Sequence, residues 1–515
     1  MMRLTMILII ALTVSSVVSA DPGSKLVIAH YMTDMVPRTD RPMNRWIDPE
    51  LADPNGSTAS LGGISQTIPM FSLYLKDADL ERAVDFEIRA ARQLGVDGFQ
   101  FYYPLGDNVR GLINHYNPIV REFIRQSETR YPGFKVSICL SHPRSEKART
   151  EAEMIELWSE PIRDLVEPTK ESPAWLRDQS GSILFYLWVG DHLADGVNHL
   201  AGTPDQIRSV GRAYRRLSEA VGTPFGYVYQ VRRPVVDPPY VEAIVETFPA
   251  VWGWTASEEN IDFWDYLARR CKARDTLYTQ TVYPDYYTSK TYPKGSKQHR
   301  ILSSEQAMAA GVQGIERHYR VTNLSATQID LLRRAVDHDV SIINYVTWND
   351  FPEGHHLAPE VNHNFGPAVL LRHFKRQWRT GRENVTSDDA ILFFKKYASH
   401  ATPKYPVSLK IKSDNKNLVG EDRIELVTLL TEPADCFLND RPLGTVAAGL
   451  RVHSIPTEPG PVRVRIVRDG RTIIAFTTPI EITDSPLRTD RLTYSYSGSH
   501  DREFKQLFEV EPPKD

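Results

Sequence analysis

The stretch IINYVTWNDFPEGHH, residues 342–356, joins an apolar strand directly to a cluster of reactive side chains. Residues 342–347 are almost all apolar or β-branched, which is typical of a buried strand. The nine residues that follow hold an indole, an amide, two carboxylates and two imidazoles, on Trp348, Asn349, Asp350, Glu353, His355 and His356. The stretch therefore predicts a buried strand that ends in a functional site.

The same pattern recurs through the first two thirds of the chain. Seven further apolar stretches precede this one: KLVIAHY, VDGFQFYY, FKVSICLSH, SILFYLWVGD, FGYVYQV, AVWGWTAS and TLYTQTVY. Segments with helical periodicity, such as DLERAVDFEIRAARQLG, separate them. Eight strands alternating with helices predict an α/β fold of the (β/α)8 TIM barrel type. A doubly wound open sheet is the alternative, but no glycine-rich phosphate loop follows the first strand.

The pattern changes near residue 382. VSLKIKS, RIELVTLL, VRVRIVRDG and TIIAFTTPIEI alternate in polarity and are separated by turn residues. We therefore predict a catalytic barrel over residues 21–382 and a C-terminal β-sandwich over residues 383–500. The last residues, 501–515, contain few apolar side chains and are predicted to form a disordered tail.

Composition excludes several classes of protein. The 515 residues carry a formal net charge of -4 and 3 cysteines. Charges of both signs are interspersed without a basic stripe, so nucleic acid is not an expected partner. The three cysteines show no CxxC spacing, which excludes a disulfide scaffold and a cysteine zinc site.

The N-terminal stretch MMRLTMILIIALTVSSVVSADPG has one arginine, an apolar core and small residues before Asp21. This pattern predicts a secretory signal peptide over residues 1–20 and a secreted or periplasmic protein. A membrane anchor is the alternative for this segment, because its length approaches what a membrane span needs. No other stretch is long and apolar enough to span, so we expect no stable membrane association.

Aromatic and polar residues gather where the predicted strands end. In a (β/α)8 barrel the carboxyl ends of the strands build the active site. Flat aromatic faces interspersed with hydrogen-bonding groups suit a sugar ring, so an oligosaccharide or polysaccharide is the expected partner. The alternative is that these side chains form the upper packing layer of the barrel. The predicted sugar-binding residues are His30, Tyr102, His142, Trp188, Asp191, Tyr229, Trp254, Tyr283, Trp348, Asn349 and His355.

Asp350 and Glu353 are the two carboxylates of the opening stretch and the predicted catalytic pair. Glycoside hydrolysis needs one acid to protonate the leaving oxygen and one carboxylate to activate water or attack. Pro352 disfavours a helix at Phe351, so we predict an extended loop with the carboxyl groups ~7–10 Å apart. One helical turn would instead bring them to ~5–6 Å, which suits covalent retention. We expect Glu353 to be the acid and Asp350 the base; a capping pair at a helix start is the alternative.

The histidines near this pair raise the alternative of a metal site. Asp350, Glu353, His355, His356, His363 and His142 are the candidate ligands. Neighbouring side chains point to opposite sides of an extended chain, and no HxH or HExxH spacing is present. We therefore predict no metal and no other cofactor.

The stretch TWNDFPEGHH resembles the motif of glycoside hydrolase family 71, the endo-α-1,3-glucanases, whose last barrel strand runs into WND-aromatic-GESH. The resemblance extends to LVIAHYM, LGVDGFQFYY, VWGWTASEEN, TVYPDYYTSK and DRIELVTLLTEPADCFLND, and so covers nearly the whole mature chain. It implies a secreted barrel with a C-terminal β-domain, no metal, and hydrolysis of α-1,3-glucan with inversion. The motif's acid pair falls on Asp350 and Glu353, and its histidine on His355.

The sequence departs from this family at the motif and on the third strand. Pro352 replaces the glycine before the glutamate, Gly354 replaces the serine after it, and the third strand ends in LSHPRSE with His142 where relatives often place an aspartate. These changes bear on the substrate and the linkage more than on the reaction class. The endo-α-mannosidase group, whose barrels carry a WNE-aromatic-GEG ending, is the nearest enzymatic alternative. A catalytically silent carbohydrate-binding protein is the alternative outside the enzymes.

Overall fold

Eight parallel strands close into a barrel, which confirms the predicted (β/α)8 fold. The computed structural model describes residues 25–38, 67–296, 300–412, 418–510 and 512. The strands pair in the order β1-β10-β7-β6-β5-β4-β3-β2, and Val27 of the first strand lies opposite Ile343 of the last. The barrel strands are β1 (Leu26–Tyr31), β2 (Gly98–Pro104), β3 (Lys135–Ser141), β4 (Ile183–Trp188), β5 (Phe225–Gln230), β6 (Ala250–Trp252), β7 (Leu277–Val282) and β10 (Ile342–Tyr345).

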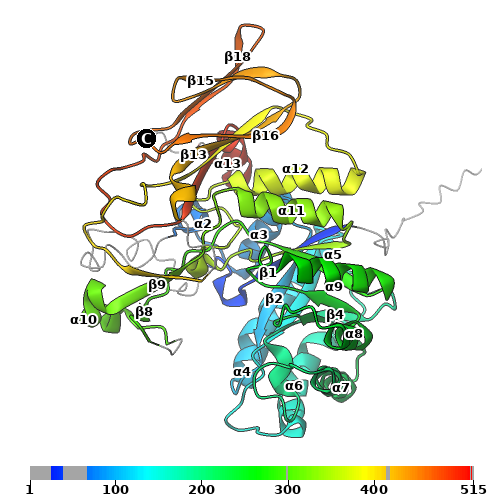
Figure 1. Ribbon diagram of the computed structural model, residues 1–515. Coiled ribbons are helices and arrows are strands. Elements are labelled where there is room, and N and C mark those ends of the chain that lie inside the picture. The colour runs from blue at the N-terminus through cyan, green and yellow to red at the C-terminus, as the bar shows by residue number, and fades with distance from the viewer. Residues whose placement is uncertain (1–24, 39–66, 297–299, 413–417, 511, 513–515) are drawn as a thin grey trace, which may run out of the picture.

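Helices surround these strands on the outside (Figure 1). They are α3 (Leu80–Leu94), α5 (Asn117–Thr129), α6 (Glu151–Val166), α7 (Pro204–Val221), α8 (Pro238–Thr247), α9 (Ile261–Ala273), α11 (Ala326–Asp337) and α12 (Gly366–Thr380). Local sequence explains several of their ends. Thr150 and Glu153 form a capping box at the start of α6, and Gly222 ends α7 in the left-handed conformation. Short turns lie at η1 (Thr33–Met35), α2 (Met70–Tyr74), α4 (Val109–Gly111), η4 (Leu112–Tyr116), η5 (Gly190–Leu193), η6 (Phe351–Glu353) and η7 (Leu418–Glu421).

An insertion between β7 and α11 projects from the side of the barrel (Figure 1). It contains β8 (Tyr292–Pro293), α10 (Ser304–Gly314) and β9 (Ile315–Tyr319). The strand β12 (Ser408–Ile411) pairs with β9 in parallel and completes a three-stranded sheet. The prediction that VSLKIKS belongs to the sandwich is therefore wrong, because its alternating pattern fits any half-buried sheet.

The C-terminal part is a β-sandwich of two four-stranded sheets, as predicted. One sheet has the order β16-β13-β11-β19 and the other β15-β14-β17-β18. Their facing side chains form a separate apolar core that includes Leu392, Phe394, Leu426, Cys436 and Ile466. The strands are β11 (Asp389–Lys395), β13 (Arg423–Leu430), β14 (Ala434–Leu438), β15 (Arg441–Val446), β16 (Gly449–Pro456), β17 (Arg463–Arg468), β18 (Arg471–Thr477) and β19 (Thr493–Ser497).

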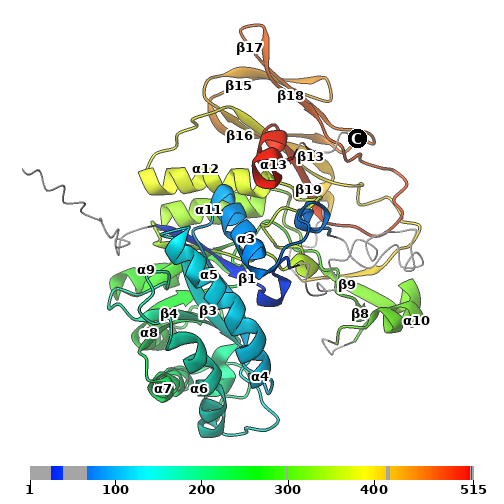
Figure 2. The same ribbon diagram turned by 180° about the vertical axis from the view of Figure 1, so that it is seen from behind.

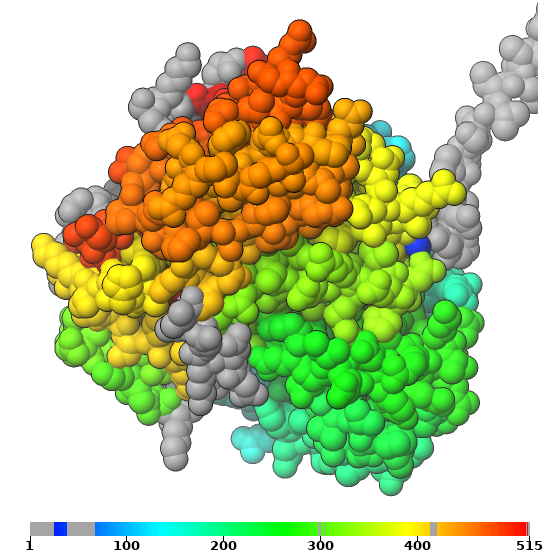
Figure 3. All heavy atoms as spheres, turned by 45° about the horizontal axis from the view of Figure 1, so that its top comes forward, coloured from blue at the N-terminus to red at the C-terminus, as the bar shows by residue number. Residues whose placement is uncertain are grey.

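The sandwich packs directly on the barrel helices. All seven residues of β11 are buried, because its two faces serve two cores. Ile391 and Phe393 join the cluster that lines the outside of the barrel, while their neighbours face the sandwich interior. Figure 3 shows the sandwich, in orange, lying against the green and yellow atoms of the barrel side. The two domains therefore share an apolar interface.

The end of the chain is helical where a disordered tail was expected. Residues His500–Phe508 form α13, and Phe504 and Leu507 are buried. Figure 2 shows α13 beside α3, which it contacts. The composition of the segment is polar, but its few apolar residues recur at helical spacing and so make one buried face. The predicted signal peptide, residues 1–20, lies outside the described residues. Within the described part of the chain, no helix combines the length and apolar character needed to cross a membrane.

Candidate active site

Side chains inside the barrel and side chains facing the outer helices form two different clusters. The inner cluster contains Ile28, Cys139, Leu184, Tyr186, Val228, Trp252 and Val346, with Trp188 and Trp254 packed against it. Successive side chains of a strand point to opposite faces, so the alternate residues belong to the outer cluster. Within a strand, a side chain therefore points into the barrel only if its position has the parity of the inner cluster, whereas residues beyond a strand end need not follow this alternation.

His30, Gln100 and Asn344 have this inner parity and are buried. Nε2 of Gln100 donates to Oδ1 of Asn344 at 2.8 Å. Burial lowers the pKa of His30 to about 4, although the charge of Asp350 and a hydrogen bond with Gln100 oppose the shift. The His30 imidazole is therefore neutral near neutral pH and keeps one nitrogen as an acceptor.

A chain of ring contacts joins most of the predicted aromatic site residues at the mouth. Its members are His30, Tyr102, His142, Trp188, Trp254 and His355. The ring centroids of His142 and Trp188 lie 4.4 Å apart, those of Trp188 and Trp254 5.1 Å, and those of Trp254 and His355 5.8 Å. Trp188 and Trp254 are partly exposed at the mouth.

Tyr229, Tyr283 and Trp348 lie on the helix side of the barrel wall, contrary to the prediction that they contact sugar. Tyr229 follows the inward-facing Val228 within β5, whereas Tyr283 and Trp348 lie beyond the ends of β7 and β10, where the strand alternation no longer sets the side-chain direction. All three belong to the outer cluster and are at most 1% exposed. The ring of Tyr229 stacks on Phe248 with centroids 4.5 Å apart, and Nε1 of Trp348 donates to the Glu87 carboxylate of α3. These three side chains fill the layer between strands and helices, and the aromatic residue type alone did not reveal the direction in which they point.

Asp191 and Asn349 were also predicted as sugar contacts, but each is about 1% exposed and already bonded within the protein. Oδ2 of Asp191 accepts from the backbone N–H of Ala201 at 2.9 Å. Oδ1 of Asn349 accepts from the N–H of Met32 at 2.7 Å, and its Nδ2 donates to the same residue's carbonyl. Both side chains hold loops in place and do not line the mouth.

The turn that carries the acid pair is fixed to the end of β1. The N–H of Trp348 donates to the carbonyl of His30 at 2.6 Å, and the N–H of Asp350 donates to Oγ1 of Thr347 at 2.9 Å. Residues Phe351–Glu353 then form a 3-10 turn, so the predicted extended loop is wrong. Pro352 occupies the first turn of this helix, where its missing N–H costs nothing.

Asp350 and Glu353 converge on one buried imidazole. Nε2 of His355 lies 3.2 Å from Oε2 of Glu353 and 3.6 Å from Oδ2 of Asp350. One ligand atom from each of the three side chains lies within 4.8 Å of the other two. Nδ1 of His355 faces the carbonyl oxygen of Val346 at 3.2 Å, and a carbonyl can only accept. Both ring nitrogens therefore face acceptors, which favours the imidazolium.

A lysine that the sequence did not single out completes the charge balance. Nζ of Lys290 lies 2.7 Å from Oε1 of Glu353, with both side chains 20% exposed. Burial opposes ionisation of Glu353, but the Lys290 ammonium and the His355 ring overcome it and hold the pKa of Glu353 well below its usual range. Burial likewise opposes the charged form of His355, yet Asp350 and Glu353 raise its pKa to about 9. Glu353 is therefore an ionised carboxylate between two cations.

Asp34 is a third carboxylate at this mouth that the sequence analysis missed. Desolvation raises the pKa of Asp34, repulsion from Asp350 adds to the shift, and attraction to Lys290 opposes it. Its side chain is exposed, so solvent screens these interactions. Asp34 follows the first strand by three residues and Lys290 lies in the stretch TVYPDYYTSK after the seventh, so both could have been found as charged residues just beyond strand ends.

Gly354 explains why the loop departs from the expected motif. Its φ of +72° is left-handed, and a Cβ there would lie 2.6 Å from the carbonyl oxygen of Tyr287 and 3.0 Å from the Leu492 side chain. A serine at this position would clash with the barrel loop and with the sandwich. The glycine therefore lets residues from both domains approach the acid pair.

Comparison with known proteins gives similarity of fold. No family model and no curated protein matches the sequence, so the resemblance to family 71 stays a prediction. A GH99 endo-α-mannosidase from Bacteroides thetaiotaomicron is 14% identical with a TM-score of 0.46, over 70% of this chain and 99% of that chain. A glycosyl hydrolase family 2 member from Bacteroides cellulosilyticus is 11% identical with a TM-score of 0.44, over 88% of this chain and 46% of that chain. At these identities the likeness concerns the fold alone.

Proposed function

We propose that the protein is a glycoside hydrolase whose reacting groups are Asp350 and Glu353. One observation carries the proposal: a single turn after β10 brings both carboxylates to one buried imidazole, beside partly exposed tryptophans at the barrel mouth. Cleavage of a glycosidic bond requires two carboxyl groups in different protonation states, and the aromatic faces suit a sugar ring. A charge pair that only stabilised the fold would not need stacking surfaces beside it.

The contacts favour a reversal of the expected roles. Glu353 is held ionised by Lys290 and His355, so it is poorly suited to donate a proton. Oδ1 of Asp350 is buried and has no hydrogen-bond partner among the described residues. We assign proton donation to the leaving oxygen to Asp350, and the role of ionised carboxylate to Glu353.

The spacing of the pair bears on the stereochemistry. Resemblance to family 71 implies inversion, which needs ~6.5–9.5 Å between carboxyl groups to admit a water. One oxygen of Asp350 lies within 4.8 Å of one oxygen of Glu353, and this close approach favours the ~5–5.5 Å carboxyl separation of retaining enzymes over the wider one. In this route Glu353 attacks the anomeric carbon while Asp350 protonates the leaving oxygen, and water then hydrolyses the glycosyl ester. We propose retention; proton NMR of the first product should then show the anomer of the cleaved linkage, and the opposite anomer would contradict it.

For the substrate we propose an α-glucan, with α-1,3-glucan first and α-mannan as the alternative. The support is the motif around Asp350 and Glu353 together with Tyr102, His142, Trp188 and Trp254, which are partly exposed, contact one another and are proposed as sugar contacts. His30 and His355 are buried and pack against these rings. Insoluble polymers of this kind occur outside the cytoplasm. With the signal peptide predicted for residues 1–20, we propose that the protein acts as a secreted or periplasmic enzyme.

The test is release of reducing sugar from a panel of insoluble α-1,3-glucan, soluble α-1,4-glucan and α-mannans. We expect release from α-1,3-glucan above all others. If sugar is released fastest from α-mannan, the proposed substrate is wrong but the proposed reaction, glycoside hydrolysis, stands. Binding to the polymers without release from any of them would contradict the enzyme and favour a carbohydrate-binding protein.

A further inference from the structure

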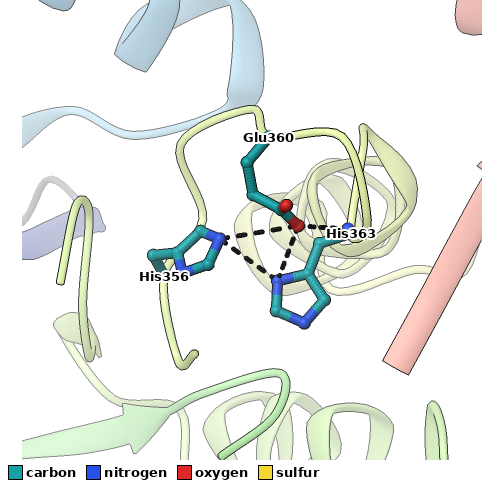
Figure 4. A group of neighbouring side chains, drawn as sticks. All are labelled: His356, Glu360 and His363. Atoms are coloured by element: carbon teal, nitrogen blue, oxygen red, sulfur yellow. Dashed lines mark hydrogen bonds and ion pairs between the residues drawn. The ribbon is translucent and has the colours of Figure 1, made fainter. Parts of the chain in front are cut away.

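The loop between the acid pair and α12 carries a second cluster of reactive side chains. His356, Glu360 and His363 are 0%, 0% and 3% exposed at the side chain. Figure 4 shows the two imidazoles and the carboxylate pointing toward one another from three positions of this loop. The proposed hydrolysis uses none of them.

The three facing atoms form a nearly equilateral triangle. Nε2 of His356 lies 3.3 Å from Nδ1 of His363, and Oε1 of Glu360 lies 3.6 Å and 3.4 Å from these two atoms. Tetrahedral zinc with ligands at ~2.0–2.1 Å separates its ligand atoms by about 3.3–3.4 Å. The triangle therefore has the size of one face of a zinc coordination shell.

A purely hydrogen-bonded cluster explains this geometry less well. Hydrogen bonds between nitrogen and oxygen are usually ~2.7–3.2 Å long, and all three separations exceed that range. The two nitrogens face each other as well as the same oxygen, so one proton cannot serve all three contacts. A cation at the centre would instead satisfy all three lone pairs at once.

Neighbouring groups orient the cluster as they do around bound metals. Nε2 of His363 lies 3.3 Å from Oδ2 of Asp285, so the proton on this nitrogen points to the carboxylate and the Nδ1 lone pair faces the centre. The other oxygen of Glu360 accepts from the N–H of Asn362 at 2.8 Å. Oε1 of Glu360 also accepts from the backbone N–H of His363 and keeps a second lone pair for the centre of the cluster. Glu360 is thus a buried carboxylate faced by two backbone N–H groups and two imidazoles, and among the described residues no lysine or arginine forms an ion pair with it. A cation at the centre would balance this buried charge.

The acid pair is a poorer metal site, although Asp350, Glu353 and His355 also lie within 4.8 Å of one another. Nζ of Lys290, 2.7 Å from Oε1 of Glu353, already supplies the cation there. A divalent ion beside this ammonium would be repelled. Among the described residues, the cluster of His356, Glu360 and His363 is therefore the better metal site.

We propose that His356, Glu360 and His363 bind one divalent transition metal, zinc by preference, as a structural site with a water as the fourth ligand. The ion would fix the loop that leaves the acid pair. That loop is also held by the sandwich, since the N–H of Ser495 donates to the carbonyl of Asn362 at 2.9 Å. The sequence analysis predicted no metal, because the spacing of four and three residues in a loop matches neither HxH nor HExxH.

The test measures metal in the full-length protein. Protein produced with zinc in the medium is dialysed against metal-free buffer and analysed by inductively coupled plasma mass spectrometry. We expect about one zinc per chain, falling at least about tenfold in His363→Gln and Glu360→Gln. His373→Gln is the matched control, because His373 is also buried, with Nε2 3.8 Å from a Glu383 oxygen, and lies outside the cluster. It should keep its zinc.

A second measurement uses the wild-type protein alone, in case the variants do not fold. Metal is removed with a chelator, and thermal unfolding is followed during titration with zinc. At free zinc about a hundred times Kd, the folding equilibrium should shift about a hundredfold toward the folded state. Cobalt should give the visible absorption bands of a tetrahedral site. Wild-type protein that holds no zinc, shows no shift and gives no cobalt bands would overturn the proposal and leave a buried hydrogen-bonded cluster.

Discussion

At the scale of single residues, the site is organised by the charge around Glu353. This carboxylate lies between the Lys290 ammonium at 2.7 Å and the His355 ring at 3.2 Å, so its ionised form is strongly favoured. Asp350 reaches the same ring at 3.6 Å, and among the described residues no lysine forms an ion pair with it. Two carboxylates three residues apart thereby acquire different environments, which is how neighbouring acids come to play different roles.

Replacing Lys290 by methionine tests this asymmetry. The lysine lowers the pKa of Glu353, so its loss should raise that pKa. Activity that requires ionised Glu353 is lost as pH falls through this pKa, so the acid limb of the kcat/KM profile should move to higher pH. The stability that ionised Glu353 contributes above its unfolded pKa should shrink in the same direction. Lys410→Met, at a side chain 46% exposed, is the control and should leave the profile unchanged. An unshifted acid limb in Lys290→Met would exclude Glu353 as the titrating group.

Gly354 offers a test of how tightly the acid turn is packed. Gly354→Ala combines a left-handed backbone with a Cβ only 2.6 Å from the Tyr287 carbonyl oxygen. Gly381 has nearly the same φ, +68°, and a Cβ there would meet nothing within 4 Å. Gly381→Ala should cost only the backbone penalty, about 1 kcal/mol, while Gly354→Ala should cost at least about 1 kcal/mol more in urea unfolding. If the two variants lose the same free energy of unfolding, the turn at Gly354 can shift to accommodate a Cβ and is not tightly packed.

The residue types of the acid pair could be predicted from sequence, but the side-chain directions could not. Asp350 and Glu353 stand out because two carboxylates follow an apolar strand. Trp348 lies two residues before the pair and yet donates to Glu87 in the helix layer, because parity across an irregular turn is not encoded in residue type. Lys290 escaped notice because its partner is 63 residues away in the chain.

At the scale of elements, the sandwich strands β11 and β19 support the loop behind the acid pair. Nζ of Lys395 in β11 donates to the Arg491 carbonyl at 2.8 Å and to Oγ1 of Thr493 at 3.0 Å. The same ammonium lies 3.8 Å from an oxygen of Asp285, which follows β7 of the barrel. Asp285 in turn accepts from the N–H of Thr493 at 2.6 Å. Buried hydrogen bonds and ion pairs of Lys395 and Asp285 thus connect the sandwich to the loop that follows β7 of the barrel.

Lys395→Met should therefore destabilise the whole protein. Lys395, Asp285 and Glu421 are all fully buried, and the variant leaves the two carboxylates without this cation. Breaking a buried ion pair from one side costs about 3–5 kcal/mol, measured here as the free energy of urea unfolding. Lys396→Met, at the neighbouring half-buried lysine, is the control and should cost below about 1 kcal/mol. A cost below about 1 kcal/mol in Lys395→Met would mean that the two domains are not coupled through this charge.

Helices and strands with strong periodicity could be predicted from the sequence, but the strands with which they pair could be predicted less well. The eight barrel strands and the two-sheet domain follow from apolar runs and alternation. The strand Ser408–Ile411 was assigned to the sandwich, yet it pairs with Ile315–Tyr319 of the barrel insertion, because alternation does not specify a partner. The helix His500–Phe508 was missed because tertiary packing of Phe504 and Leu507, and not composition, stabilises it.

At the scale of the whole molecule, the barrel sets the position of the acids and the sandwich holds the loop behind them. β10 closes the barrel between β1 and β7, so the turn at its carboxyl end is carried by a rigid wall. Hydrogen bonds from this turn reach the end of β1, and a Cβ at Gly354 would meet the Leu492 side chain of the sandwich. The catalytic geometry we propose is therefore a property of both domains together.

The most direct test compares wild-type protein with Asp350→Asn and Glu353→Gln on the polymer that the wild type cleaves fastest. Each substitution keeps the size of the side chain and removes its ability to exchange a proton, and circular dichroism checks that the variants are folded. The account predicts reducing-sugar release at least about a hundredfold slower in each variant than in the wild type. A folded variant of either residue that releases sugar at the wild-type rate would contradict the assignment of that residue.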